Sequence, residues 1–204
     1  LSYAGFSVFH DEALEPLFHA GIPVAVKNTG NPAAAGTLIV ADREAVEEPV
    51  VGIAATSGFC SVYVSKYLMN REIGFGRRLL AIYEDEAIPF EHTPSGIDNL
   101  SVIVREEFFS HATEERVLRR IRTELAADEV SVERGLALVM VVGEGMRHTV
   151  GLAARATGAF ARSGVNLEMI NQGSSEVSMM FGIKEGDVTA AVRSLYDEFF
   201  SGSG

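Results

Sequence analysis

One stretch of this chain occurs twice at a constant spacing. Gly74 to Val104 returns as Gly151 to Phe181, displaced by 77 residues at both ends with no gap in between. The residues identical at this spacing are Met69 and Met146, Gly74 and Gly151, Arg78 and Arg155, Glu91 and Glu168, Gly96 and Gly173, and Ser101 and Ser178. Self-similarity at a fixed spacing indicates one structural unit used twice, so fold and function are both to be sought in that unit.

Each copy predicts an alternation of strands and helices. Phe75, Leu79 and Tyr83 recur at helical spacing as one apolar stripe. The first copy predicts, in order, a strand over 59–64 after a Ser57-Gly58 turn, a helix over 74–86, strands over 90–93 and 99–105 joined by a turn over 94–98, a helix over 113–126 and a strand over 129–133. This βαββαβ order is a ferredoxin-like plan of the α+β class, with an antiparallel sheet and two helices on one face of each unit.

The second copy runs out of chain before its last strand. Its second helix starts near Asp187, and the following strand would begin near residue 203 of 204. A spare apolar strand, VVGIAAT over 50–56, precedes the first copy. Because a sheet edge would otherwise be left open, this early strand is predicted to complete the late unit. The first unit, residues 57–134, is then inserted in the second, residues 50–56 and 135–204.

Residues 1–49 do not match the repeat and predict a short α/β remnant. One helical face is formed by Phe6, Phe9, Ala13, Leu17 and Ala20. Gly21 is expected to end this helix. Strands are predicted over 22–26 and 37–40, and the charged residues 42–49 are expected to form a linker.

Composition argues against several classes of partner. The net charge of −11 and a pI near 4.9 would repel nucleic acid and phospholipid surfaces. Cys60 is the only cysteine and lies in an apolar strand, which predicts a buried side chain in a reducing compartment. No signal peptide or bilayer-length apolar run is found, so a cytoplasmic protein is expected. The start at Leu1, in mid-pattern, suggests a piece of something longer.

Catalytic and metal-binding motifs are not found. The five histidines show no ligand spacing. No GxSxG, HExxH or Walker-type loop is present. Gly74-x-Gly76 and Gly143-x-Gly145 each precede a helix, but neither extends to a dinucleotide fingerprint. No catalytic residue, metal ligand or cofactor is therefore predicted in this chain.

A ligand-binding interpretation has more support. A glycine opens the first helix of each copy, and helix N-termini expose N–H groups that bind carboxylates. The amides of Phe75 and Gly76, or of Leu152 and Ala153, could hold the α-carboxylate of an amino acid, with an ammonium group near an acidic side chain. The plainer interpretation makes the glycines helix caps, the acidic residues a solvated face, and Met69 and Met146 packing residues instead of lids.

The repeat resembles a known family. The runs VSKYLMNREIGFGRRLLAIYEDEAIPFEHTPSGIDNLSVIV and VVGEGMRHTVGLAARATGAFARSGVNLEMINQGSSEVSMMFGI resemble the tandem ACT domains of bacterial aspartate kinases. The upstream run AGIPVAVKNTGNPAAAGTLI resembles the end of that enzyme's catalytic domain.

This resemblance implies a regulatory role. Aspartate kinases transfer the γ-phosphate of ATP, with Mg, to the β-carboxylate of aspartate, on the route to lysine, threonine and methionine. Their ACT pairs bind end-product amino acids, transmit inhibition, and usually associate as dimers. The family's phosphate loop and aspartate-binding residues are not in this sequence, so the chain alone is expected to be inactive.

The resemblance also implies two sets of effector-binding residues. In the first unit they are Met69, Glu72, Gly74, Phe75 and Gly76 at the helix start, Pro89, Phe90 and Glu91 on the strand, and Ser95, Gly96, Ile97 and Asp98 in the turn. In the second unit they are Met146, Thr149, Gly151, Leu152, Asn166, Leu167, Glu168 and Gln172. Pro89, which has no N–H, and the longer PSGID turn depart from many relatives. Lysine is the expected effector, with its ammonium near Glu91 or Asp98. Threonine is the alternative ligand, and a ligand-free dimerisation module is the alternative function.

Overall fold

The computed structural model describes residues 15–17, 19–40, 49–173 and 177–201. Most of the predicted N-terminal helix and the linker residues 42–48 lie outside these ranges. Within them, residues 15–17 are helical and Gly21 has a φ of 66°. The strands β1 (Val24–Val26) and β2 (Thr37–Ile39) follow and pair as an antiparallel hairpin.

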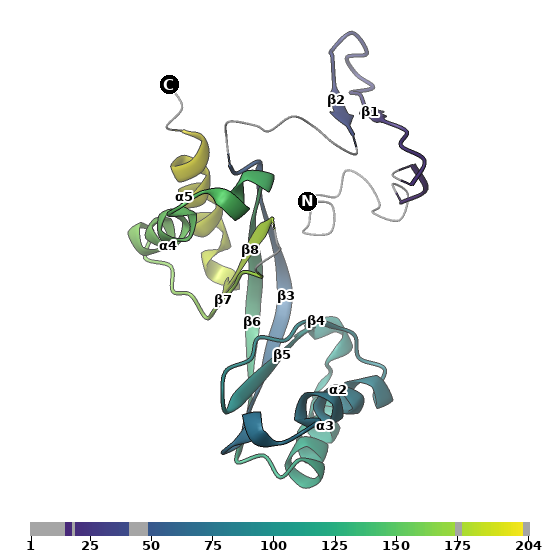
Figure 1. The fold of residues 1–204 in the computed structure, drawn as a ribbon, viewed down its shortest axis with the longest axis vertical. Coiled ribbons are helices and arrows are strands. Elements are labelled where there is room, and N and C mark those ends of the chain that lie inside the picture. The colour runs from purple at the N-terminus through teal and green to yellow at the C-terminus, as the bar shows by residue number, and fades with distance from the viewer. Residues whose placement is uncertain (1–14, 18, 41–48, 174–176, 202–204) are drawn as a thin grey trace.

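One antiparallel sheet of six strands carries both copies of the repeat (Figure 1). Its strands are β3 (Gly52–Ser65), β4 (Phe90–His92), β5 (Asn99–Arg105), β6 (Glu129–Val142), β7 (Met169–Asn171) and β8 (Ser178–Lys184). They lie in the order β4-β5-β3-β6-β8-β7. The two central strands, β3 and β6, have 14 residues each and pair along nearly their whole length. Each central strand therefore serves both units.

Two pairs of helices cover different halves of this sheet (Figure 1). They are α2 (Phe75–Asp85) with α3 (His111–Glu124), and α4 (Leu152–Arg162) with α5 (Val188–Phe200). Short 3₁₀ helices lie between these elements: η1 (Met69–Arg71), η2 (Glu106–Phe108), η3 (Glu144–His148) and η4 (Glu185–Asp187). Buried apolar side chains such as Leu79 and Ile121 form the core under the first pair, and Ala156 and Leu195 belong to the core under the second. Within the described ranges, no helix has the length and apolar character needed to cross a bilayer.

The first unit is inserted in the second, as the sequence predicted. The early part of β3 pairs with the late part of β6, starting at Gly52 opposite Val142. Just before it, the Val51 N–H donates to Val142 O at 2.8 Å. Val50 is only 2% exposed and lies in the core under α4 and α5. The strand that precedes the first copy of the repeat thus packs with the C-terminal half of the chain.

The turn predicted at Ser57-Gly58 is wrong. β3 continues through both residues, and its register with β6 shifts on either side of Phe59. Gly58 has a φ of 92°, and its N–H donates to Glu185 Oε1 at 2.6 Å. A bulge therefore bends one continuous strand where the Ser-Gly pair suggested a break between two strands.

The sheet face away from the helices carries a third, smaller core. Val102 and Val104 lie in the α2/α3 core, so Ile103 between them points to the opposite face. There it packs with Phe59, Leu136 and Leu138, and with Met169 and Met180 from β7 and β8. This open face therefore brings the first unit against the edge of the second.

Candidate effector site

The backbone at the start of α2 is where the sequence predicted that a carboxylate would bind. Gly74 precedes the helix with φ 78° and ψ 13°, a left-handed conformation that favours glycine. The first helical hydrogen bond runs from Arg78 N–H to Gly74 O at 3.1 Å. The Phe75 N–H donates to Glu72 O at 3.2 Å, so the expectation that this amide is open to a carboxylate is wrong. The Gly76 N–H has no acceptor in the described chain and remains available.

Glu72 is held by two basic side chains of its own unit. Lys66 Nζ lies 2.7 Å from its carboxylate, and Arg78 Nη2 binds the other carboxylate oxygen. These contacts, the hydrogen bond from Lys66 first, lower the pKa of Glu72 from its ordinary value of 4.5. Lys66 Nζ also donates to Leu125 O at 2.7 Å. Glu72 thus fixes the loop before α2, and its charge is already compensated.

Asp98 lies beside this loop and carries an unsatisfied oxygen. The Lys66 N–H donates to Asp98 O at 3.0 Å, so the residue that binds Glu72 also fixes the turn over 94–98. Leu100, which follows that turn, lies 4.0 Å from the position a Cβ would take on Gly76. Asp98 Oδ1 is buried and has no hydrogen-bond partner among the described residues. A carboxylate oxygen in this state is an acceptor without a donor.

The edge strand β4 divides its predicted residues between the two faces of the sheet. Phe90 is 47% exposed and, with Pro89, lines a groove of about 710 Å³ against α2. Glu91 instead points to the open face, where it accepts a hydrogen bond from Arg105 Nε at 2.7 Å. The structure therefore does not bring Glu91 to the start of α2, and Asp98 remains as the acidic side chain there.

The second unit repeats the geometry with fewer charges. Gly151 precedes α4 with a φ of 87°. The Thr149 hydroxyl donates to Gly145 O at 2.8 Å, and Asn166 Nδ2 donates to Glu168 Oε1 at 3.1 Å. Leu167 packs against the α4/α5 core, Leu152 is 3% exposed, and Gln172 is exposed.

The two repeated methionines are packing residues in this structure. Met69 is 7% exposed and Met146 is 3% exposed, and each lies in the core of its own unit. The residue directly before each helix-opening glycine is instead exposed to solvent. Ile73 and Val150, which are equivalent in the repeat, are 97% and 99% exposed. Sequence reasoning missed this pair, although both are apolar residues beside a proposed binding loop.

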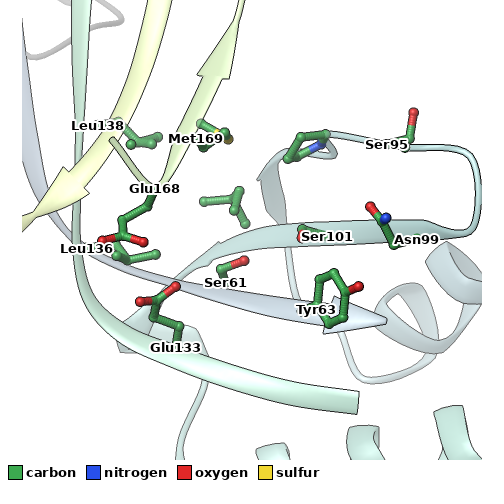
Figure 2. A pocket seen from close by; sticks show the side chains of 14 residues that line it. Ser61, Tyr63, Ser95, Asn99, Ser101, Glu133, Leu136, Leu138, Glu168 and Met169 are labelled. Atoms are coloured by element: carbon green, nitrogen blue, oxygen red, sulfur yellow. The ribbon is translucent and has the colours of Figure 1, made fainter. Parts of the chain in front are cut away.

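A cavity between the units was also missed, because it joins residues far apart in the chain. It has a volume of about 410 Å³ and lies between the open face of the first unit and β7 (Figure 2). Ser95 and Gly96 of the predicted first set and Glu168 of the second set line this same cavity. Glu133 also lines the cavity, and its carboxylate binds Lys184. The turn over 94–98 thus faces α2 through Asp98 and faces the second unit through Ser95 and Gly96.

Comparisons with known proteins give this geometry a context. The model of the ACT domain family matches residues 139–199. Aspartokinase 3 of Bacillus subtilis is 62% identical over 99% of this chain and 44% of its own length. The crystal structure of Clostridium acetobutylicum aspartate kinase superposes with a TM-score of 0.91 at 36% identity, over 98% of this chain and 46% of that one. The chain matches the ACT-containing C-terminal region of aspartokinases.

The aspartokinase relatives are longer than this chain, which spans less than half of the two just named. Escherichia coli aspartokinase III, solved in complex with lysine and aspartate in its T-state, superposes with a TM-score of 0.73 over 95% of this chain and 42% of that one. At 22% identity this likeness shows the fold alone. In the part of the chain that the structure describes, no three His, Cys, Asp or Glu side chains gather closely enough to hold a metal ion.

Proposed function

We propose that this aspartokinase regulatory region senses an amino acid at the start of α2, with lysine as the first candidate. The buried Asp98 Oδ1 without a partner is the observation that carries the proposal. Leaving a buried acceptor unpaired costs about 1–3 kcal/mol, and more when the group is charged. A ligand ammonium would supply the missing donor and recover that free energy.

The remaining contacts would come from the helix terminus. The Gly76 N–H has no acceptor in the described residues, and the helix dipole favours negative charge at this end. An α-carboxylate on Gly76 and a side-chain ammonium on Asp98 together fit lysine. Glu72 would not take part directly, because Lys66 and Arg78 already compensate its charge.

Lysine is placed ahead of threonine for two reasons. The E. coli aspartokinase III structure of the same fold was solved with lysine. The residue with the unpaired oxygen, Asp98, is also an acid, and an acid suits the side-chain ammonium of lysine better than the hydroxyl of threonine. Threonine remains the alternative ligand, and it would bind through its hydroxyl.

Association through the edge of the first unit is part of the same proposal. Ile73 just before α2, Phe90 on edge strand β4 and Ile97 in the turn after β4 are 97%, 47% and 71% exposed. Exposed apolar side chains on and beside an open edge strand favour contact with a second copy. A homodimer formed here would cover the bound amino acid.

The larger context is proposed as well. Residues 57–134 would act as the first sensing unit, residues 50–56 and 135–204 as the second, and residues 1–49 as the end of a catalytic domain. The phosphotransfer from ATP and Mg to aspartate would belong to the whole protein, in the cytoplasm. Ligand binding would then inhibit it through a coupling free energy of about 1–3 kcal/mol.

Isothermal titration of this chain with lysine, and separately with threonine, tests the proposal. Asp98→Asn is expected to weaken lysine binding about tenfold or more, because it removes a charge-assisted contact. Glu107→Gln, at an exposed position in η2, is the matched control and should bind as the parent does. Binding of threonine alone would favour the alternative ligand. No heat with either amino acid would favour a ligand-free dimerisation module.

A further inference from the structure

Two glycines in the loop before α4 lie directly against the chain that enters the second unit. A Cβ on Gly143 would fall 1.9 Å from Pro49 O, and a Cβ on Gly145 would fall 2.7 Å from Pro49 Cα. Real Cβ atoms essentially never come within 3.0 Å of such backbone atoms. Gly143 has a φ of 175°, an extended conformation open to any residue, so its contact with Pro49 is what requires glycine. The Gly143-x-Gly145 pattern therefore forms a close packing site for Pro49, which we call the Pro49 seat.

The residues that directly follow Pro49 are fixed to the second unit. The Val51 N–H donates to Val142 O at 2.8 Å, which extends the pairing of β3 with β6. Val50 is 2% exposed and shares a core with Met146 and Leu152. Pro49 is thus the last residue before the chain becomes part of the second unit.

The other side of the same loop contacts the second set of proposed effector residues. Gly145 O accepts the Thr149 hydroxyl at 2.8 Å, and Gly143 O accepts the Met146 N–H at 3.2 Å. Gly145 is therefore in contact with Pro49 on one side and hydrogen-bonded to Thr149 on the other.

We infer that the Gly143-x-Gly145 loop transmits the state of the second unit's binding loop to the chain segment that enters at Pro49. A ligand that takes the Thr149 hydroxyl, or the amide at the start of α4, releases or shifts the Gly145 carbonyl. The close approach leaves no free space between Gly145 and Pro49, so a shift of the loop displaces Pro49 as well. This ligand-dependent step rests on the proposed sensing function, whereas the seat itself does not.

Hydrogen exchange in the full-length protein that carries this region tests the inference, read by mass spectrometry in peptides that contain the Val51 N–H. Without ligand, Gly145→Ala and Pro49→Ala are expected to raise exchange at Val51 about tenfold or more, because each disturbs the seat. Gly186→Ala is the matched control, since a Cβ there meets nothing within 4 Å. Pro49→Ala keeps the backbone atoms that face the two glycines but frees the φ angle that the proline ring fixes, and it keeps the test valid if Gly145→Ala fails to fold. Exchange at Val51 equal to the parent in both variants would overturn the seat.

A second arm adds saturating lysine or threonine. The parent is expected to change its exchange at Val51, and Gly145→Ala to lose that change. Protection of residues 146–172 with no change at Val51 would refute the coupling while leaving amino-acid sensing intact. Absence of any ligand effect, with the variants still raising exchange at Val51, would instead refute the sensing function and leave the seat in place.

Discussion

Arg105 Nε donates to Glu91 Oε1 at 2.7 Å on the sheet face away from α2. The Arg105 guanidinium also lies 5.0 Å from the centre of the Phe59 ring. This contact ties edge strand β4 to β5 and directs the Glu91 carboxylate away from the start of α2. An acidic residue in the expected position of the sequence therefore has a structural role on the opposite face.

Glu91→Gln should accordingly leave amino-acid binding by the first unit within about twofold of the parent, because its carboxylate is bound by Arg105 on the sheet face away from α2. Isothermal titration with lysine beside Asp98→Asn measures the difference. Equal losses in the two variants would return Glu91 to the binding site.

Gly74→Ala should lower the free energy of unfolding by about 1–2 kcal/mol, because an L residue is strained at a φ of 78°. No neighbouring atom lies within 4 Å of the new Cβ, so the loss would be purely conformational. Gly76→Ala, two residues further on and inside α2, should instead raise stability by about 0.5–1 kcal/mol. Urea unfolding of both variants gives the comparison, and a loss at Gly76 as large as that at Gly74 would contradict it.

Tyr83→Phe should leave stability unchanged or raise it by up to about 1 kcal/mol. The Tyr83 side chain is 1% exposed, and its hydroxyl has no hydrogen-bond partner among the described residues. Burial raises the pKa of this phenol well above its ordinary value of 10. Removing an unsatisfied buried group avoids its desolvation cost, and the equivalent position of the second unit is already Phe160. The midpoint of urea unfolding is the measurement, and a loss above about 1 kcal/mol would reveal a partner for the hydroxyl.

Ionisation of the Glu198 carboxylate should make the free energy of unfolding depend on pH in the acidic range. Arg155 Nε lies 2.7 Å from its carboxylate and Arg162 binds the other oxygen, and these contacts, Arg155 first, lower its pKa from the ordinary value of 4.5. Because the folded-state pKa is the lower one, the stabilisation is complete above pH 4.5 and is lost as the pH falls through the folded-state value.

Glu198→Gln should therefore be less stable than the parent at pH 7, and the difference should shrink below about pH 4. Thermal unfolding at a series of pH values measures this. A difference that stays constant down to pH 3 would show that Glu198 stabilises α4 and α5 by packing alone.

The repeat predicted much of the fold because helix periodicity and strand spacing are local. The helix starting at Gly74 and the strand over 99–105 appear almost at their predicted bounds. The missing last strand of the second copy also correctly predicted the insertion. Ser57-Gly58 was wrongly predicted as a turn because bulges and turns use the same small residues. Only the pairing with β6 distinguishes the two.

The candidate site was less predictable because its charges pair across the fold. Glu72 meets Lys66 and Arg78 nearby, but Glu91 meets Arg105 only through the pairing of β4 with β5. The cavity of Figure 2 depends on β7 approaching the open face of the first unit, a contact that no local pattern encodes.

The shared central strands have a mechanical consequence. β3 and β6 each run through both copies of the repeat without a linker, and the bulge beside Phe59 bends β3 without ending its pairing with β6. A change of twist at the α2 end is carried along the same two backbones to the α4 end. Conformational coupling between the two halves would accordingly depend on the twist of β3 and β6, not on movement at a linker.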